Sequence, residues 1–159
     1  MNAALVFALS LVAQPGDAAI PKNAAKELAY YVGDWKGTTT FQGQMTPASW
    51  KSTWAPGKFC VVIHEEYVIN GQKSQVTVLF GWDRIKKRLT NWGLRGDGGN
   101  RTLIYDEGFL KGSVVGDMPD GTPFKGRFFV TKVNAKEMKI KLEATDPKGA
   151  GTFVIHMTK

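Results

Sequence analysis

Apolar and polar residues alternate with a period of two over most of the chain from Trp35 onward. This is the pattern of β-strands that bury one face and expose the other. Residues typical of turns interrupt the alternation about every ten residues, so the sequence predicts roughly ten strands. The predicted strands cover residues 34–42, 47–55, 58–69, 73–82, 87–95, 101–107, 109–116, 123–133, a ninth strand that follows Lys136 and contains Met138 to Ala144, and 151–158.

A short segment before the strands follows a helical pattern instead. Residues 21–31 place Ala24 and Leu28 on one apolar face, with Asn23 as the expected N-cap and Gly33 as the stop signal. A helix of this length is marginal on its own, so it must pack on another element. We expect it to cover one end of a barrel.

The connections between the predicted strands are short, which favours pairing of strands that follow each other in the chain. Asn70-Gly71 has the composition of a tight hairpin turn. The fold class is therefore all-β: an up-and-down antiparallel barrel of about ten strands, wide enough for a small ligand. Trp35 is expected to plug the barrel end beneath the helix, with Gly33 allowing the turn and Gly37 a bend in the first strand.

Length and composition fit a single domain. The chain has 159 residues, of which 43% are hydrophobic and 22% charged. Residues 1–19 are interpreted as a secretory signal, because an apolar segment at residues 1–13 is too short to span a bilayer and small residues offer cleavage after Ala13 or Ala19. Residues 20–159 would then form one secreted or periplasmic domain without a stable membrane anchor.

The formal net charge is +7, and the basic residues are densest between Arg84 and Arg88. Such a balance favours contact with an anionic surface such as acidic glycan or lipid, or serves solubility alone. Nucleic acid is not an expected partner, since no zinc-ligand spacing, helix-turn-helix pattern or RNA-binding aromatic motif is present.

The residues that commonly perform chemistry are few. His64 and Glu66 share one strand face with Cys60, but no spacing supplies a third ligand, so no metal site is predicted. No nucleophile motif is present either, and a dyad of Cys60 and His64 would span about 13 Å along one strand. We therefore name no catalytic residue, and an enzymatic activity stays uncertain.

Glu65 is the most informative charged residue, because its neighbours on the same strand face, Ile63 and Tyr67, are apolar. A carboxylate in such surroundings must be paired or have a raised pKa. Arg95 and Arg127 are candidate partners; the pair would orient a polar group of a ligand or form a plain core salt bridge. The candidate ligand-binding residues are His64, Glu65, Glu66, Trp82, Trp92, Arg95 and Arg127.

The segment Gly33-Asp34-Trp35-Lys36-Gly37 resembles the opening of calycin barrels, where a Gly-x-Trp follows a short helix. Trp54-Ala55-Pro56-Gly57-Lys58-Phe59, Glu65-Glu66-Tyr67, Gly71-Gln72 and Phe80-Gly81-Trp82-Asp83 extend this resemblance toward the secreted bacterial family called domain of unknown function 1579. The resemblance covers roughly residues 26–158. It implies a lipocalin-like barrel with an internal cavity and no established activity.

Haem-binding nitrobindin-type barrels are more distantly similar. Gly33, Trp35 and Gly37 match their opening, whereas Thr38-Thr39-Thr40 and the residues after it lack their extended motif. Haem is therefore an alternative cofactor, with His156 as the ligand implied by its late strand. The main expectation is a barrel that holds a small apolar molecule.

Overall fold

A computed structural model describes residues 20–69 and 71–159 of this chain. The predicted secretory signal and Asn70 of the expected hairpin turn lie outside the described residues. The elements are α1 (Lys22–Tyr31), β1 (Gly33–Phe41), β2 (Gln44–Trp54), the 3-10 helix η1 (Pro56–Lys58), β3 (Cys60–Ile69), β4 (Gln72–Asp83), β5 (Arg88–Arg95), β6 (Asn100–Tyr105), β7 (Lys111–Asp117), β8 (Pro123–Asn134), β9 (Glu137–Asp146) and β10 (Gly149–Thr158).

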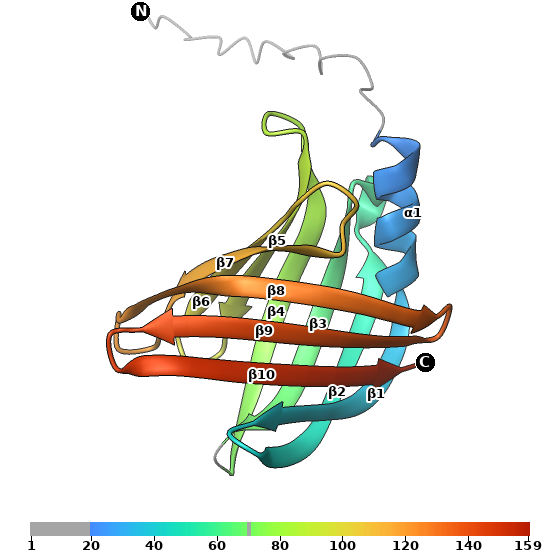
Figure 1. Cartoon of the computed structure of the whole chain (residues 1–159). Coiled ribbons are helices and arrows are strands. Elements are labelled where there is room, and N and C mark those ends of the chain that lie inside the picture. Colours follow the sequence, from blue (N-terminus) through green and yellow to red (C-terminus); the bar gives the residue numbers. More distant parts are fainter. Residues whose placement is uncertain (1–19, 70) are drawn as a thin grey trace, which may run out of the picture.

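The ten strands form a closed antiparallel barrel in which each strand pairs with its neighbours in the chain. β1 also pairs with β10, which closes the sheet and leaves no free edge. α1 covers one end of this barrel (Figure 1). The predicted all-β, up-and-down barrel with a short N-terminal helix is confirmed.

Some predicted boundaries and roles were wrong. α1 begins at Lys22 after Pro21, so Asn23 lies inside the helix and does not cap it. Phe59 was predicted inside a strand, but it follows η1 in the β2–β3 connection and is 59% exposed. Residues 106–110 form a loop between β6 and β7, closed by a hydrogen bond from the Asp106 amide to the Lys111 carbonyl. In the two strand cases, turn geometry overrode an alternating pattern that continued into the connection.

The end of the barrel beneath α1 is packed solid. Trp35 is fully buried there, and its Nε1 donates a hydrogen bond of 2.8 Å to the Tyr31 carbonyl oxygen. A chain of aromatic contacts crosses the interior from Tyr31 to Phe80, Tyr105 and Phe128, with ring centroids 5.0, 5.0 and 4.7 Å apart. Trp35 therefore lies beneath the helix, as the sequence predicts, and the aromatic side chains close that end of the barrel.

Glycines on β7 give the large side chains of β8 room to lie flat against the wall. Gly112 pairs with Phe128 and Gly116 with Phe124 across the two strands. A Cβ atom at either glycine would lie 2.8 or 2.7 Å from the partner ring. The aromatic rings therefore occupy the volume that a side chain on β7 would need.

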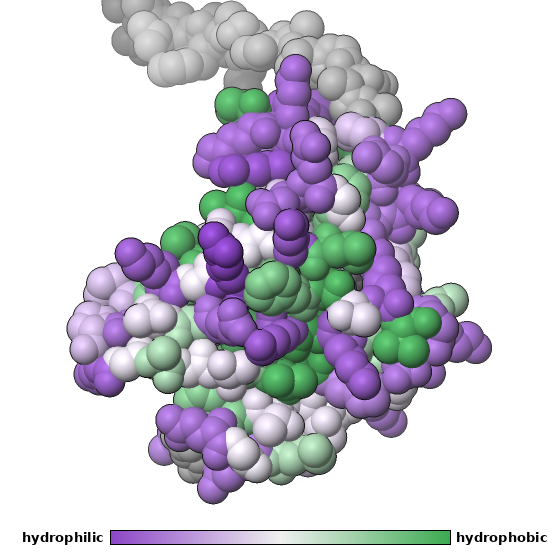
Figure 2. All heavy atoms as spheres, in the orientation of Figure 1, coloured by the Kyte–Doolittle hydropathy of each residue, from purple (hydrophilic) through white to green (hydrophobic). Residues whose placement is uncertain are grey.

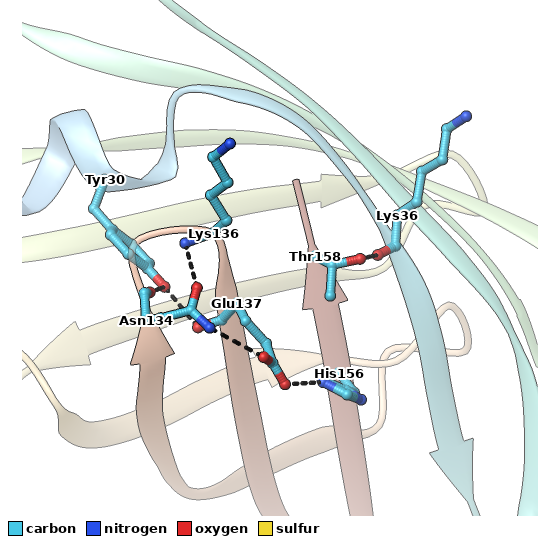
Figure 3. A network of polar contacts seen from close by, with 7 residues as sticks. All are labelled: Tyr30, Lys36, Asn134, Lys136, Glu137, His156 and Thr158. Atoms are coloured by element: carbon cyan, nitrogen blue, oxygen red, sulfur yellow. Dashed lines mark hydrogen bonds and ion pairs between the residues drawn. The ribbon is translucent and has the colours of Figure 1, made fainter.

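Polar contacts attach α1 to the β8–β9 hairpin (Figure 3). The Tyr30 hydroxyl lies 3.0 Å from the carbonyl oxygens of both Asn134 and Glu137. The Glu27 carboxylate, 7% exposed, pairs with the Lys132 ammonium of β8. α1 is thus held by an ion pair and hydrogen bonds as well as by its apolar face. In the described part of the chain, no helix combines the length and apolarity needed to cross a membrane.

Replacing Tyr30 with phenylalanine is expected to lower the free energy of unfolding by about 1 kcal/mol, the usual net value of a hydrogen bond. The ring would stay, so the packing of Tyr30 near Trp35, with centroids 5.5 Å apart, would be kept. Urea unfolding followed by tryptophan fluorescence measures the change. An unaltered midpoint would show that the hydroxyl does not contribute to holding α1.

Candidate functional site

A cavity of about 380 Å³ occupies the barrel interior at the end away from α1. Its wall is mostly apolar, and the apolar side chains come from five strands and one loop of the barrel. The apolar residues that line it are Phe41, Trp50, Met118, Phe124, Leu142, Ala144, Ala150, Phe153 and Ile155. The polar residues that line it are Thr39, Gln42, Glu65, Tyr67, Arg95, Asn100, Arg101, Asp146 and Lys148.

Small residues on the last two strands leave this end of the interior open. Ala144 on β9 pairs with Gly151 on β10, so neither strand projects a large side chain there. Phe41 and Phe153 stack on one another beside them, with centroids 4.2 Å apart and an interplanar angle of 12°. The result is a cavity with flat aromatic and aliphatic walls, in contrast to the filled end beneath α1.

A buried ion pair interrupts the apolar wall. Nη2 of Arg101 on β6 lies 2.8 Å from Oε1 and 2.7 Å from Oε2 of Glu65 on β3. The side chains are 17% and 5% exposed, respectively. Both residues line the cavity, so a bound molecule would meet this pair.

Gly93 explains how Arg101 reaches Glu65 across the two intervening strands. Gly93 on β5 is the cross-strand partner of Arg101, and it has no side chain to block the path. A Cβ atom at Gly93 would lie 3.1 Å from Cγ and 3.3 Å from Nε of Arg101, and 3.2 Å from a methyl of Val76. The arginine stem therefore lies against the bare backbone of β5.

The electrostatics of the pair keep the arginine charged. Burial lowers the pKa of Arg101, but the adjacent Glu65 carboxylate, together with Tyr67 and Tyr105, raises it by more, so the pKa lies above its usual range. Arg101 offers five N–H donors, and among the described residues its Nε has no hydrogen-bond partner. Nε is buried against β5, so only the terminal nitrogens of the guanidinium can face the cavity that Arg101 lines.

The mouth of the cavity is lined by charged residues that are paired with one another. Arg95 forms an ion pair with Asp97, and its hydrogen bond lowers the pKa of the aspartate. Lys148 lies 2.9 Å from Asp120, and its hydrogen bond lowers the pKa of this carboxyl. Because each cation has its own carboxylate, the rim does not present a single strong charge to an entering molecule.

The structure places the sequence-predicted site residues in three locations. Glu65 and Arg95 line the cavity. Trp82 packs against the hydrophobic core and is not among the residues that line the cavity. The others project from the outer face of their strands: His64, Glu66, Trp92 and Arg127.

The predicted partner of Glu65 was wrong, because neither Arg95 nor Arg127 contacts it. Arg95 pairs with Asp97, whereas Arg127 is exposed on β8. Arg101 was not singled out, although it alternates with the buried Leu103 and Tyr105 and so shares their inward face. That alternation is the signal in the sequence that Arg101 points inward. The sequence does not show which strands face each other across the barrel interior, so it does not identify Arg101 as the partner of Glu65.

The two histidines do not line the cavity. His64 is exposed on β3, and Nε2 of His156 on β10 lies 2.8 Å from Oε1 of Glu137 on the outer face (Figure 3). Among residues 20–69 and 71–159, no three His, Cys, Asp or Glu side chains come together in a way that could hold a metal ion. The thiol of Cys60 is buried, and burial raises its pKa, which disfavours the reactive thiolate.

Comparison with known proteins does not show a family for this chain. No protein-family model and no curated protein matches the sequence. Among solved structures, the chain is similar to a redesigned β-barrel, with 13% identity over 86% of this chain and 94% of the other and a TM-score of 0.43.

Proposed function

We propose that this protein binds a small, largely apolar molecule carrying one polar group, inside the barrel cavity. The observation that carries the proposal is the pair of Glu65 and Arg101 in an otherwise mostly apolar wall. Binding pockets for small molecules typically combine apolar walls with a few fixed polar groups, in volumes of about 300–1,000 Å³. The cavity of about 380 Å³ falls at the small end of this range.

The ion pair defines the polar group that the ligand should carry. Arg101 still has N–H donors that Glu65 does not use, and Tyr67 lines the cavity beside it. A neutral hydrogen-bond acceptor such as a carbonyl or hydroxyl oxygen can accept from these donors. A carboxylate would be repelled by Glu65, because the negative charge of Glu65 already neutralises the positive charge of Arg101. We therefore favour a neutral amphipathic ligand over a fatty acid.

We also propose that the protein is a calycin-type barrel that acts outside the cytoplasm. The position of Trp35 beneath a short helix at the start of the first strand supports the calycin assignment. The apolar segment at residues 1–13 with small residues after it supports secretion. N-terminal sequencing of the protein from fractionated cells tests this, since a mature start after Ala13 or Ala19 is expected.

Filling the cavity is expected to abolish binding. Native mass spectrometry of the purified protein should show a co-purified small molecule, and a fluorescent apolar probe should compete with it. Ala144→Trp places a large side chain inside the cavity and is expected to reduce probe affinity at least about tenfold, because the apolar contact area is lost.

Thr145→Trp is the matched control, because Thr145 lies next along β9 and is exposed on the outer face. It introduces the same side chain without entering the cavity and should leave binding unchanged. Equal probe affinity of both variants and the unmodified protein would place the binding site elsewhere and contradict the proposal. Absorbance of the purified protein in the Soret region would instead favour the haem alternative.

A further inference from the structure

The β4–β5 hairpin extends beyond the end of the barrel that α1 covers (Figure 1). Ile85 at its tip is 93% exposed, the highest exposure among the large apolar side chains of the described residues. Arg84, Lys86 and Lys87 flank it and are also exposed. An apolar side chain is thus presented to the surroundings in the middle of a group of cations.

The tip has a defined conformation. Oδ1 of Asp83 accepts hydrogen bonds from the backbone amides of Ile85, at 3.1 Å, and Lys86, at 2.9 Å. Lys87 adopts a φ of 50°, which turns the chain back into β5. Asp83 therefore uses its carboxylate to shape the turn and to hold Ile85 outward.

A second apolar side chain with an adjacent cation lies beside the hairpin. Phe59 is 59% exposed and follows Lys58 in the β2–β3 connection. Its carbonyl oxygen lies 3.5 Å from the Cβ position of Gly81, near the end of β4 that leads into the hairpin. We call the residues of both connections the hairpin surface: Lys58, Phe59, Arg84, Ile85, Lys86 and Lys87.

The cations of the hairpin surface are available to a partner. None of them forms an ion pair with a carboxylate in residues 20–69 or 71–159. The first turns of α1 add Lys22 and Lys26 at the same end (Figure 1), where Figure 2 shows mostly hydrophilic residues around a small hydrophobic area. The acidic residues in the β6–β7 loop, Asp106 and Glu107, lie at this end as well and limit the basic area.

We propose that the hairpin surface docks the protein onto an anionic phospholipid bilayer. Lysine and arginine side chains are attracted to the negative surface potential of such a bilayer. Exposed apolar side chains can then enter the boundary between headgroups and acyl chains, which adds binding that cations alone do not provide. A soluble polyanion would use the cations but would offer nothing to Ile85 and Phe59, so the lipid surface is the better match.

Docking in this way has a consequence for the cavity. Successive connections of an up-and-down barrel alternate between its two ends, so the hairpin surface and the cavity mouth lie at opposite ends. A docked barrel would hold the cavity mouth toward the aqueous phase. The surface would therefore localise the protein at a membrane while ligand exchange takes place with solvent.

Vesicle flotation with the full chain tests the proposal. Binding is expected to vesicles of equal parts phosphatidylglycerol and phosphatidylcholine, to weaken as salt is added, and to be absent with phosphatidylcholine alone. The double variant Lys86→Glu/Lys87→Glu should lose at least about tenfold in binding, because two attractive charges become repulsive. Ile85→Ser keeps every charge and should still weaken binding severalfold.

The control variant Lys125→Glu/Lys139→Glu makes the same change in net charge on the outer faces of β8 and β9, where both lysines are exposed. It should retain most of the binding. An equal loss in the control, or no binding to anionic vesicles, would overturn the proposal. The proposal would also be overturned if the protein bound heparin strongly and the Ile85→Ser variant bound anionic vesicles as well as the unmodified protein does. Residues 1–19 are identical in every variant, so differences between variants report on the hairpin surface.

Discussion

Replacing Gly37 with valine is expected to lower the free energy of unfolding by at least about 3 kcal/mol, the upper range for an overpacked interior. A Cβ atom at Gly37 would lie 1.8 Å from the carbonyl oxygen of His156 and 3.0 Å from Cα of Met157. These are backbone atoms of β10, the strand that closes the barrel against β1. They cannot move aside without opening the closing ladder, so the cost falls on the whole barrel.

Urea unfolding monitored by tryptophan fluorescence measures this change. Gly96→Ala is the matched control, because the nearest atom to its Cβ position is the Gln75 carbonyl oxygen at 3.7 Å and its φ is not in the left-handed region. The control should change the unfolding midpoint little. If Gly37→Val unfolded at the same urea concentration as the unmodified protein, β1 and β10 would have to pair differently from this structure.

Replacing Glu65 with alanine is the second change with a large expected effect, a loss of about 3–5 kcal/mol of stability. The carboxylate accepts both hydrogen bonds from Nη2 of Arg101, and the arginine side chain is only 17% exposed. Truncation would leave a buried cation without its partner. Desolvation of that cation, rather than the lost contact itself, accounts for most of the expected cost.

The double variant Glu65→Leu/Arg101→Met separates these contributions. It removes both charges and keeps similar volume, so it should be far more stable than Glu65→Ala and close to the unmodified protein. A double variant as unstable as the single one would show that the two residues are not coupled. The double variant should also weaken binding of a ligand with a carbonyl or hydroxyl group while retaining a purely apolar probe.

The two ends of the barrel differ in ways that bear on function. Beneath α1 the interior is filled by Trp35 and a chain of aromatic rings. At the other end small residues such as Ala144 leave a cavity that reaches Glu65 and Arg101. The residues that fill the end beneath α1 are therefore different from those that line the cavity, so the Ala144→Trp test addresses the cavity without disturbing the packed end.

Several features of this protein follow from local sequence pattern. The period of two after Trp35 determined the strands and their inward faces, because only one face of each strand can be buried. The helical spacing of Ala24 and Leu28 identified the covering helix, and both side chains are fully buried. Glycine before and after Trp35 marked the entry into the barrel. Each of these features depends only on residues that are close together in the sequence.

Only the tertiary structure determined which side chains meet across the lumen. Glu65 and Arg101 are 36 positions apart, and they meet because Gly93 leaves a path across β5. The cavity likewise depends on how closure of β1 on β10 brings Ala144 and Gly151 to the same wall as Phe41. The alternation of a strand gives the face of each residue, but the shear and closure of the barrel decide its neighbours.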